Sequence, residues 1–157
     1  MEKTAETPLQ PHPQKLKDIY AWQEKNLRVR HITNLKQYYE RKKRFLTSAD
    51  GQRFLRYRKK KFCVLHGLSI WIVDGNALRS GGESGDVDFT MGGHGYFYVY
   101  IPKNEIWIDD TNANCGDLWP TIWHEYLERK LMKRGITYNT AHTLASQLEI
   151  SLRTKNR

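Results

Sequence analysis

The sequence has little cysteine and no long apolar run, and both shortages exclude classes of protein. Its two cysteines, Cys63 and Cys115, lie 52 positions apart. This spacing matches no short zinc or redox motif and provides no disulfide framework, so a reducing, cytoplasmic setting is expected. The most apolar stretch, residues 68–73, is far shorter than the roughly 20 residues that span a bilayer. The polar, proline-rich residues 1–14 lack the apolar region of a secretory signal, and we expect no membrane segment.

Acidic residues are scarce in the first third of the chain, and basic residues are scarce in the part that follows. Residues 15–61 contain 16 Lys or Arg against 4 Asp or Glu, whereas residues 62–128 contain 2 Lys or Arg against 10 acidic residues. A length of 157 residues is typical of one domain with one core. We predict a flexible tail over residues 1–14 and a single domain over residues 15–157. In this domain a basic helical arm (15–61) precedes a sheet and a helical hairpin (62–157).

The spacing of apolar residues changes from helical to strand-like near residue 62. Helical spacing over residues 15–46 and a very basic segment over residues 52–62 predict helices. Branched and aromatic runs predict strands at residues 68–73, 96–101 and 105–109, with a short strand near 87–90. Asp74-Gly75 is a strong turn dipeptide and predicts a hairpin at the end of the first run. Together these strands predict an antiparallel meander of three to five strands.

The last 40 residues of the chain predict a helical hairpin. Pro120 is a favoured first-turn residue, and Gly135 is a favoured residue just after a helix end. Thr137 fits the N-cap of a second helix that runs to about Leu152. The order of helices, antiparallel sheet and helix pair predicts an α+β fold.

Two histidines and several carboxylates converge on this predicted helix pair. His124 and Glu128 are four residues apart and lie side by side on one helix face. Tyr138, His142 and Glu149 share one face of the second helix at spacings of four and seven. When the two helices fold back antiparallel, His142 comes close to Glu128 and His124 comes near Glu149. Groups of this kind must be hydrogen-bonded or bound to a metal, because an unpaired buried polar group costs about 1–3 kcal/mol.

The segment His124-Glu125-Tyr126-Leu127-Glu128, followed by a downstream histidine, resembles the active-site helix of zincin-type metallopeptidases, in a minimal gluzincin-like form. In that family a His-Glu-x-x-His helix supplies two metal ligands and a catalytic glutamate. The resemblance implies His124 as a metal ligand, Glu125 as the general base that takes a proton from the attacking water, and His142 as the third ligand. Glu128 stands where the family has its second histidine. Residues 70–149 are also similar to small viral and environmental proteins of unassigned activity.

A His, Glu, His ligand set implies Zn²⁺, with Fe²⁺ or Mn²⁺ as alternatives, because a carboxylate also suits harder ions. The resemblance implies metal-dependent hydrolysis of a peptide or protein substrate. Independently of the resemblance, the Tyr138 hydroxyl is a candidate hydrogen-bond donor to a developing oxyanion. The simpler interpretation of Tyr138 is an aromatic residue at the edge of the core.

Structural roles remain open for each member of the site. Glu125 would form an exposed pair with Arg129, four residues on. His124 and Glu128 would form a buried hydrogen bond that only ties the helix to the sheet. His94, within Gly92-Gly-His-Gly95, is either a further ligand or donor or, as the glycines favour, a surface turn residue. Glu149 is a further ligand candidate.

The basic arm admits three interpretations. Clusters at residues 41–44 and 56–61 have the composition of a surface that contacts nucleic-acid phosphates. They would equally form a solvated helix face, or fold against the acidic segment 62–128. The first interpretation gives the alternative function, a non-enzymatic nucleic-acid-binding or assembly protein that uses residues 41–61.

Overall fold

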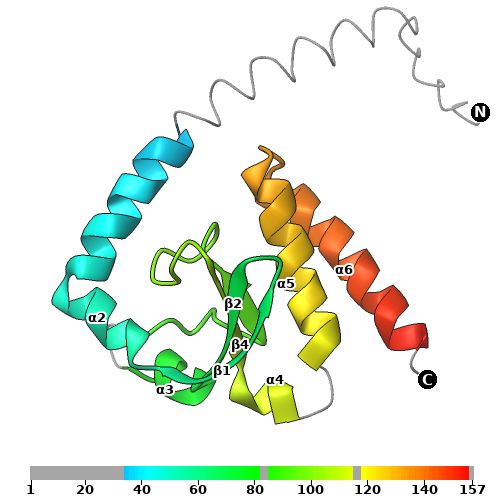
Figure 1. The fold of residues 1–157 in the computed structure, drawn as a ribbon, viewed down its shortest axis with the longest axis horizontal. Helices are drawn as coiled ribbons and strands as arrows, with labels where there is room; N and C mark the ends of the chain where they lie inside the picture. Colours follow the sequence, from blue (N-terminus) through cyan, green and yellow to red (C-terminus); the bar gives the residue numbers. More distant parts are fainter. Residues whose placement is uncertain (1–33, 82–84, 115–117, 156–157) are drawn as a thin grey trace, which may run out of the picture.

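The computed structural model describes residues 34–81, 85–114 and 118–155. The predicted tail at residues 1–14 and residues 15–33 of the predicted helix 15–46 lie outside the described residues. Residues 34–47 are helical, in agreement with the rest of that prediction. A four-stranded sheet lies between this N-terminal part and a pair of long C-terminal helices (Figure 1). The α+β class is therefore confirmed.

The sheet is mixed, and the prediction of an antiparallel meander is wrong. Its strands are β1 (Arg58–Leu65), β2 (Leu68–Val73), β3 (Gly92–His94) and β4 (Glu105–Asp109), in the order β1-β2-β4-β3. The two central strands, β2 and β4, run parallel, and the outer pairs are antiparallel. Parallel neighbours need a long crossover. The chain makes it between residues 74 and 104, and β3 forms on the way, at the free edge of β4.

Both faces of the central strands are buried, which explains their branched and aromatic composition. On one face Trp107 and Val73 pack with Phe54 of helix α2 (Ala49–Leu55) and with Leu78 of helix α3 (Gly75–Arg79). On the other face isoleucines of β2 and β4 pack against Ile122 of helix α5 (Leu118–Lys133). The sheet is thus the middle of three layers. Helix α5 packs across strands β3 and β4 on one of its faces.

The basic segment after residue 52 is a strand for most of its length, so the predicted helix 52–62 is wrong beyond Leu55. Ser48 caps α2 by accepting a hydrogen bond from the Gly51 backbone, and α2 ends at Leu55. The lysines at positions 59–61 lie exposed on β1, which is an edge strand. Lysines on an edge strand oppose pairing with another chain. The lysines at positions 59–61 therefore lie on an edge strand, although the composition of this segment is also typical of a helix surface.

Two turns also differ from the prediction. The β1–β2 hairpin turns at His66-Gly67, where both residues have positive φ angles (48° and 78°), as a two-residue turn with two left-handed positions requires. Asp74-Gly75 does not make a hairpin, because the Asp74 side chain accepts a hydrogen bond from Ala77 and caps α3. Residues 96–101 and 87–90 form turns instead of the predicted strands.

The aromatic residues of segment 96–101 contribute to the core from these turns. Tyr100 stacks on Phe54 with ring centroids 4.3 Å apart, and Tyr98 lies edge-on to Phe89. Tyr98 and Tyr100 thus pack into the core from turns and not from a strand.

The helical hairpin matches the prediction. Helix α5 precedes α6 (Tyr138–Lys155), and Gly135 between them has a φ of 95°, which favours glycine. Thr137 directly precedes α6, and its carbonyl accepts the hydrogen bond of Ala141. A short helix, α4 (Asp110–Asn114), joins β4 to α5 through segment 115–117. No helix of the described residues is both long and apolar enough to cross a membrane.

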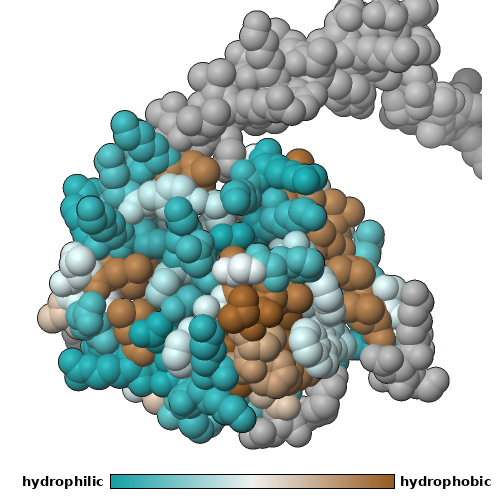
Figure 2. Space-filling view, viewed as in Figure 1, coloured by the Kyte–Doolittle hydropathy of each residue, from teal (hydrophilic) through white to brown (hydrophobic). Residues whose placement is uncertain are grey.

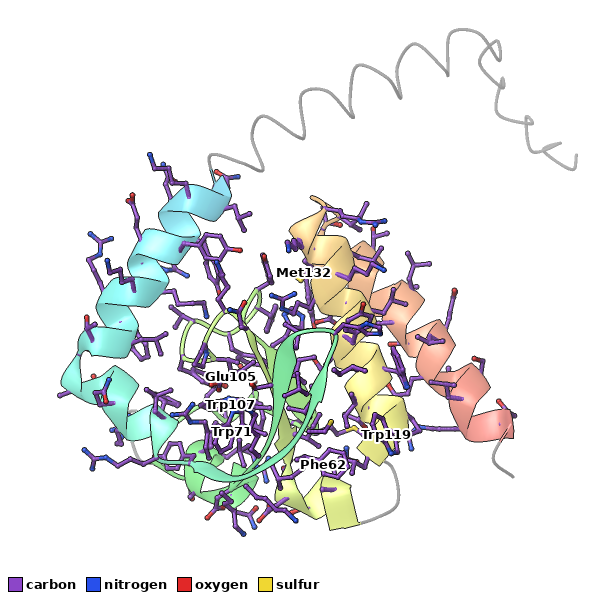
Figure 3. All side chains as sticks on the ribbon, in the orientation of Figure 1. Phe62, Trp71, Glu105, Trp107, Trp119 and Met132 are labelled. Atoms are coloured by element: carbon purple, nitrogen blue, oxygen red, sulfur yellow. The ribbon has the colours of Figure 1, made fainter. Side chains whose placement is uncertain are left out.

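The surface is unevenly polar in the view of Figure 2. Hydrophilic residues cover most of the N-terminal helix, and hydrophobic ones gather over the β1–β2 hairpin and along the C-terminal helices. Figure 3 shows Phe62 of β1 beside Trp119 of α5, and their rings meet edge-on at 5.7 Å. On the other side of the strands it shows Trp71, Glu105 and Trp107 together. These aromatic groups join β1 and β2 to the rest of the domain.

Lys42 fixes the helix 34–47 to the rest of the domain. Its side chain is buried, and its ammonium donates hydrogen bonds to the carbonyls of Tyr98 (2.7 Å), Val99 (3.1 Å) and Ile101. All three donors of the ammonium are thus used by one turn of backbone. This lysine of the basic arm therefore has a structural role.

We expect Lys42→Met to destabilise the fold by about 2–4 kcal/mol, because it leaves buried carbonyls without a donor. The neighbouring Lys43 is exposed, so Lys43→Met should change the free energy of unfolding by less than about 0.5 kcal/mol. Urea unfolding of both variants measures the difference. Equal stabilities would show that the three carbonyls do not depend on Lys42.

Candidate metal centre

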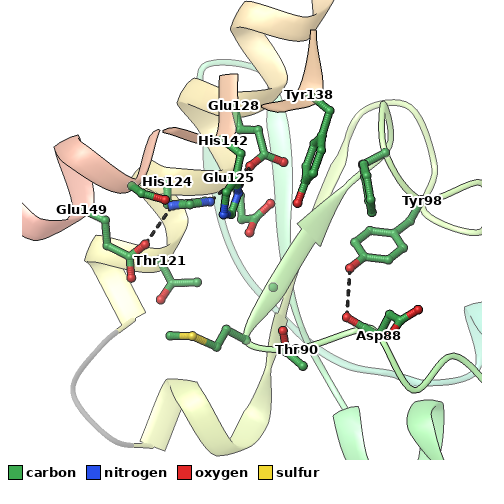
Figure 4. Close-up of a pocket in the computed structure, with 14 residues that line it drawn as sticks. Asp88, Thr90, Tyr98, Thr121, His124, Glu125, Glu128, Tyr138, His142 and Glu149 are labelled. Carbon is green, nitrogen blue, oxygen red and sulfur yellow. Dashed lines mark hydrogen bonds and ion pairs between the residues drawn. The ribbon is translucent and has the colours of Figure 1, made fainter. Parts of the chain in front are cut away.

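The predicted site residues line one cavity of about 300 Å³ between α5, α6 and the sheet. Figure 4 shows Glu125 and Glu128 of α5 facing Tyr138 and His142 of α6. His124 lies between them and Glu149. The convergence expected from the antiparallel helix pair is therefore present in the structure.

The Glu128 carboxylate is the centre of the cluster. It is 4% exposed, and three imidazoles from three elements contact it. Its Oε1 lies 2.8 Å from His94 Nε2, and its Oε2 lies 3.2 Å from His124 Nε2 and 2.8 Å from His142 Nδ1. Burial alone would raise the pKa of Glu128, but these histidines outweigh it and lower that pKa to about 2. Glu128 is therefore ionised throughout the neutral range.

His94 is completely buried on β3, so the expectation of a surface turn residue is wrong. Its Nδ1 accepts a hydrogen bond from the Tyr96 backbone N–H (3.1 Å). Burial lowers the pKa of His94, so its ring is neutral, and its one proton must be on Nε2. Nε2 then donates to Glu128 and has no lone pair to offer a metal ion. His94 therefore orients the Glu128 carboxylate and is not itself placed to bind a metal ion.

His124 lies between two carboxylates. Besides Glu128, its Nδ1 is 2.8 Å from Glu149 Oε2, an ion pair whose angle is poor for a hydrogen bond. Burial alone lowers the pKa of His124, but Glu128 and Glu149 together raise it to about 10. Arg153 in turn holds Glu149 through a 2.6 Å contact. Glu149 therefore orients His124 from the side opposite Glu128. The sequence had suggested Glu149 only as a further metal ligand.

Glu125 is buried, so the exposed pair with Arg129 is not its role. The side chain is 7% exposed, and Arg129 instead donates to the Lys103 carbonyl at 2.8 Å. Burial raises the pKa of Glu125 to about 8, with a further contribution from the negative charge of Glu128. Since Gly92 of β3 has no side chain, the strand approaches closely: a Cβ there would lie 3.3 Å from Glu125 Cγ. Gly92 therefore lets β3 lie close against α5.

The outer wall of the cavity is aromatic. Tyr138 stacks on Phe97 with centroids 4.2 Å apart and lies 5.3 Å from His142, whose side chain is 47% exposed. The Tyr138 hydroxyl points into the cavity in Figure 4. Sequence reasoning missed Phe97 and Tyr98 as cavity residues, because segment 96–101 was expected to be a strand.

Within the part of the chain that the structure describes, two groups of side chains have ligand atoms within 4.8 Å of one another. One is His124, Glu128 and His142, and the other is His94, Glu125 and Glu128. The first group fits a divalent cation better, because His142 is open to the cavity and the His94 ring presents a proton. Metal binding there requires His124 to lose its proton, so affinity rises with pH. A nitrogen, oxygen, nitrogen donor set suits Zn²⁺, Fe²⁺ or Mn²⁺.

Part of the basic arm pairs with the acidic body. Arg58 contacts Glu105 at 2.7 Å, and Lys59 contacts Asp110 at 2.9 Å. Some of the charge asymmetry is therefore intramolecular, as the third interpretation of the arm proposed. Arg41, Lys43 and Arg44 of the N-terminal helix are exposed.

The buried charge of Glu125 predicts a pH-dependent stability in the metal-free protein. A carboxyl whose pKa is raised from 4.5 to about 8 makes folding less favourable as pH rises between these values. Glu125→Gln removes that loss, so with a chelator present the variant should gain about 2–4 kcal/mol over wild type between pH 4.5 and pH 8. Urea unfolding at several pH values tests this. A constant difference across the range would contradict the burial of an ionisable Glu125.

Comparison with known proteins gives no match: no family model, no curated protein and no solved structure is significantly similar to this chain. The relation to zincin-type metallopeptidases therefore stays a prediction from the His-Glu-x-x-Glu segment. The function must be argued from the geometry of the cavity.

Proposed function

We propose that this protein is a metal-dependent hydrolase that acts on a peptide bond. His124, Glu128 and His142 would hold the metal ion, with Zn²⁺ as the first candidate. One observation carries the proposal: ligand atoms of these three residues lie within 4.8 Å of one another at the wall of an open cavity. A purely structural cluster would not need a half-exposed histidine at the cavity.

A bound divalent cation lowers the pKa of a water molecule and polarises a carbonyl group, which is the chemistry that hydrolysis requires. Glu125 is the base in this proposal, because it lines the cavity next to both His124 and Glu128 on the same helix. The Tyr138 hydroxyl, which points into the cavity, would donate a hydrogen bond to the substrate oxygen that gains negative charge. His94 and Glu149 orient the ligands from outside.

The second candidate is a nucleic-acid-binding or assembly protein whose His/Glu cluster is structural. Its support is the exposed group of Arg41, Lys43 and Arg44 on one helix. The two candidates differ in whether the cluster takes up metal and whether the arm binds phosphates.

Glu128→Gln and Glu125→Gln separate ligand from base. Glu128→Gln should reduce metal content at least about tenfold, because it weakens a metal ligand that His94 orients. Glu125→Gln should keep metal and lose hydrolysis of casein or a peptide library by a factor of about 10²–10⁴, because only proton transfer is lost. Elemental analysis and product detection by mass spectrometry measure both effects.

The matched control is Glu40→Gln, at an exposed glutamate on the helix 34–47. It should keep both metal and activity. If wild-type protein takes up no zinc, iron or manganese ion, the proposed function is wrong. Full metal occupancy in Glu128→Gln would show that the ligand assignment is wrong.

The second candidate predicts that combined replacement of Arg41, Lys43 and Arg44 by Gln weakens DNA or RNA binding and flattens its salt dependence, because fewer counterions are released. Fluorescence anisotropy with a labelled oligonucleotide at several salt concentrations measures both. An unchanged affinity and slope would exclude this helix as the contact surface.

A further inference from the structure

A second cavity, of about 410 Å³, lies between the β1–β2 turn and the C-terminal half of α5. It shares no lining residue with the cavity of the metal centre. The described residues that line it include four with a permanent positive charge and none with a negative one. They are His66, Leu68, Tyr126, Arg129, Lys130, Lys133 and Arg134.

Arg129 is the unusual member of this lining. It is 7% exposed, and among the described residues no carboxylate forms an ion pair with it. Its Nη2 donates to the Lys103 carbonyl, and its guanidinium lies 4.8 Å from the centroid of the Tyr96 ring. Its Nε is buried without an acceptor. One carbonyl and one ring offset part of the desolvation cost but do not neutralise the charge.

Helix electrostatics explain some of the other cations. Lys130 and Lys133 lie in the last turn of α5, where positive charge is favoured by the helix dipole. Lys130 also lies 5.9 Å from the centroid of the Tyr126 ring, which in turn packs against His66. This explanation does not extend to Arg129, because a charge that only complements a helix end gains nothing from burial. A buried arginine beside several exposed cations is the arrangement expected where an anion completes the charge balance.

We propose that this cavity binds a phosphate group. Arginine is suited to phosphate because its planar donors bind two oxygens at once, and lysines add charge without fixing direction. Arg129, Lys130 and Arg134 bring three positive charges, which match a di- or polyanionic phosphate better than a single carboxylate. The volume accommodates a phosphate or diphosphate and part of the ester that carries it. The Tyr126 ring offers an apolar wall for that remaining part.

The test is calorimetric titration of the full chain with inorganic pyrophosphate, at low ionic strength and with a chelator to exclude binding through a metal ion. Wild type should bind. Because Arg129→Gln removes contacts to Lys103 and Tyr96 as well, the decisive variant is Lys130→Gln with Arg134→Gln, two exposed positions. It should weaken pyrophosphate binding about tenfold or more. Lys60→Gln with Lys61→Gln removes the same charge from exposed positions elsewhere, on β1, and should bind like wild type.

A parallel titration with a short single-stranded oligonucleotide identifies the source of the phosphate. If pyrophosphate binds and the oligonucleotide does not, the ligand is a small phosphate ester. If the oligonucleotide binds and depends on Lys130 and Arg134, the phosphate belongs to a nucleic acid. If neither binds, or if both variant pairs lose affinity equally, the cavity is not a phosphate site. Metal content is measured on the same samples, so this result is independent of the proposed hydrolase.

Discussion

The structure depends most on one buried carboxylate, that of Glu128. A buried negative charge is tolerated only when hydrogen-bonded or neutralised, and here the partners come from β3, α5 and α6. Any shift of these three elements would separate at least one imidazole from the carboxylate. The helix pair and the edge strand are therefore held in register by a polar contact as well as by apolar packing. Its strength depends on all three partners, because removing one leaves part of a buried charge unpaired.

This constraint explains why the edge of the sheet is built from glycine. For His94 to reach Glu128, β3 must pass directly under α5. At Gly92 an added Cβ would lie 3.0 Å from the Trp107 carbonyl, and at Gly93 it would lie 2.5 Å from the Tyr98 ring. Neither position has room for a side chain without a shift of its neighbours. Gly92 lets β3 approach α5, since a Cβ there would lie 3.3 Å from Glu125 Cγ, and Gly93 makes room for the Tyr98 ring.

Sequence reasoning succeeded where the geometry is local and failed where it depends on distant partners. The convergence of His124, Glu128 and His142 follows from helical spacing and an antiparallel hairpin, and both can be derived without coordinates. The parallel pairing of β2 and β4 cannot be derived in this way, because it depends on which strand buries the second face of β2. His94 was misjudged for the same reason: its glycine neighbours indicated exposure, and only the packing of α5 makes the position buried. The lysines of β1 have the composition of a helix surface, and only the position of β1 at the sheet edge explains them.

The distribution of protons separates a structural cluster from a metal centre. With Glu128 ionised, each of the three imidazoles that contact it must present an N–H. The Tyr96 backbone fixes the tautomer of His94, so its proton cannot leave without breaking a second hydrogen bond. His124 holds an additional proton because Glu128 and Glu149 stabilise its cation, and His142 reaches solvent. The protons that a cation could replace are therefore those of His124 and His142. They are the two histidines that helical spacing and the antiparallel hairpin had placed beside Glu128, whereas the buried His94 retains its proton and holds the carboxylate in position.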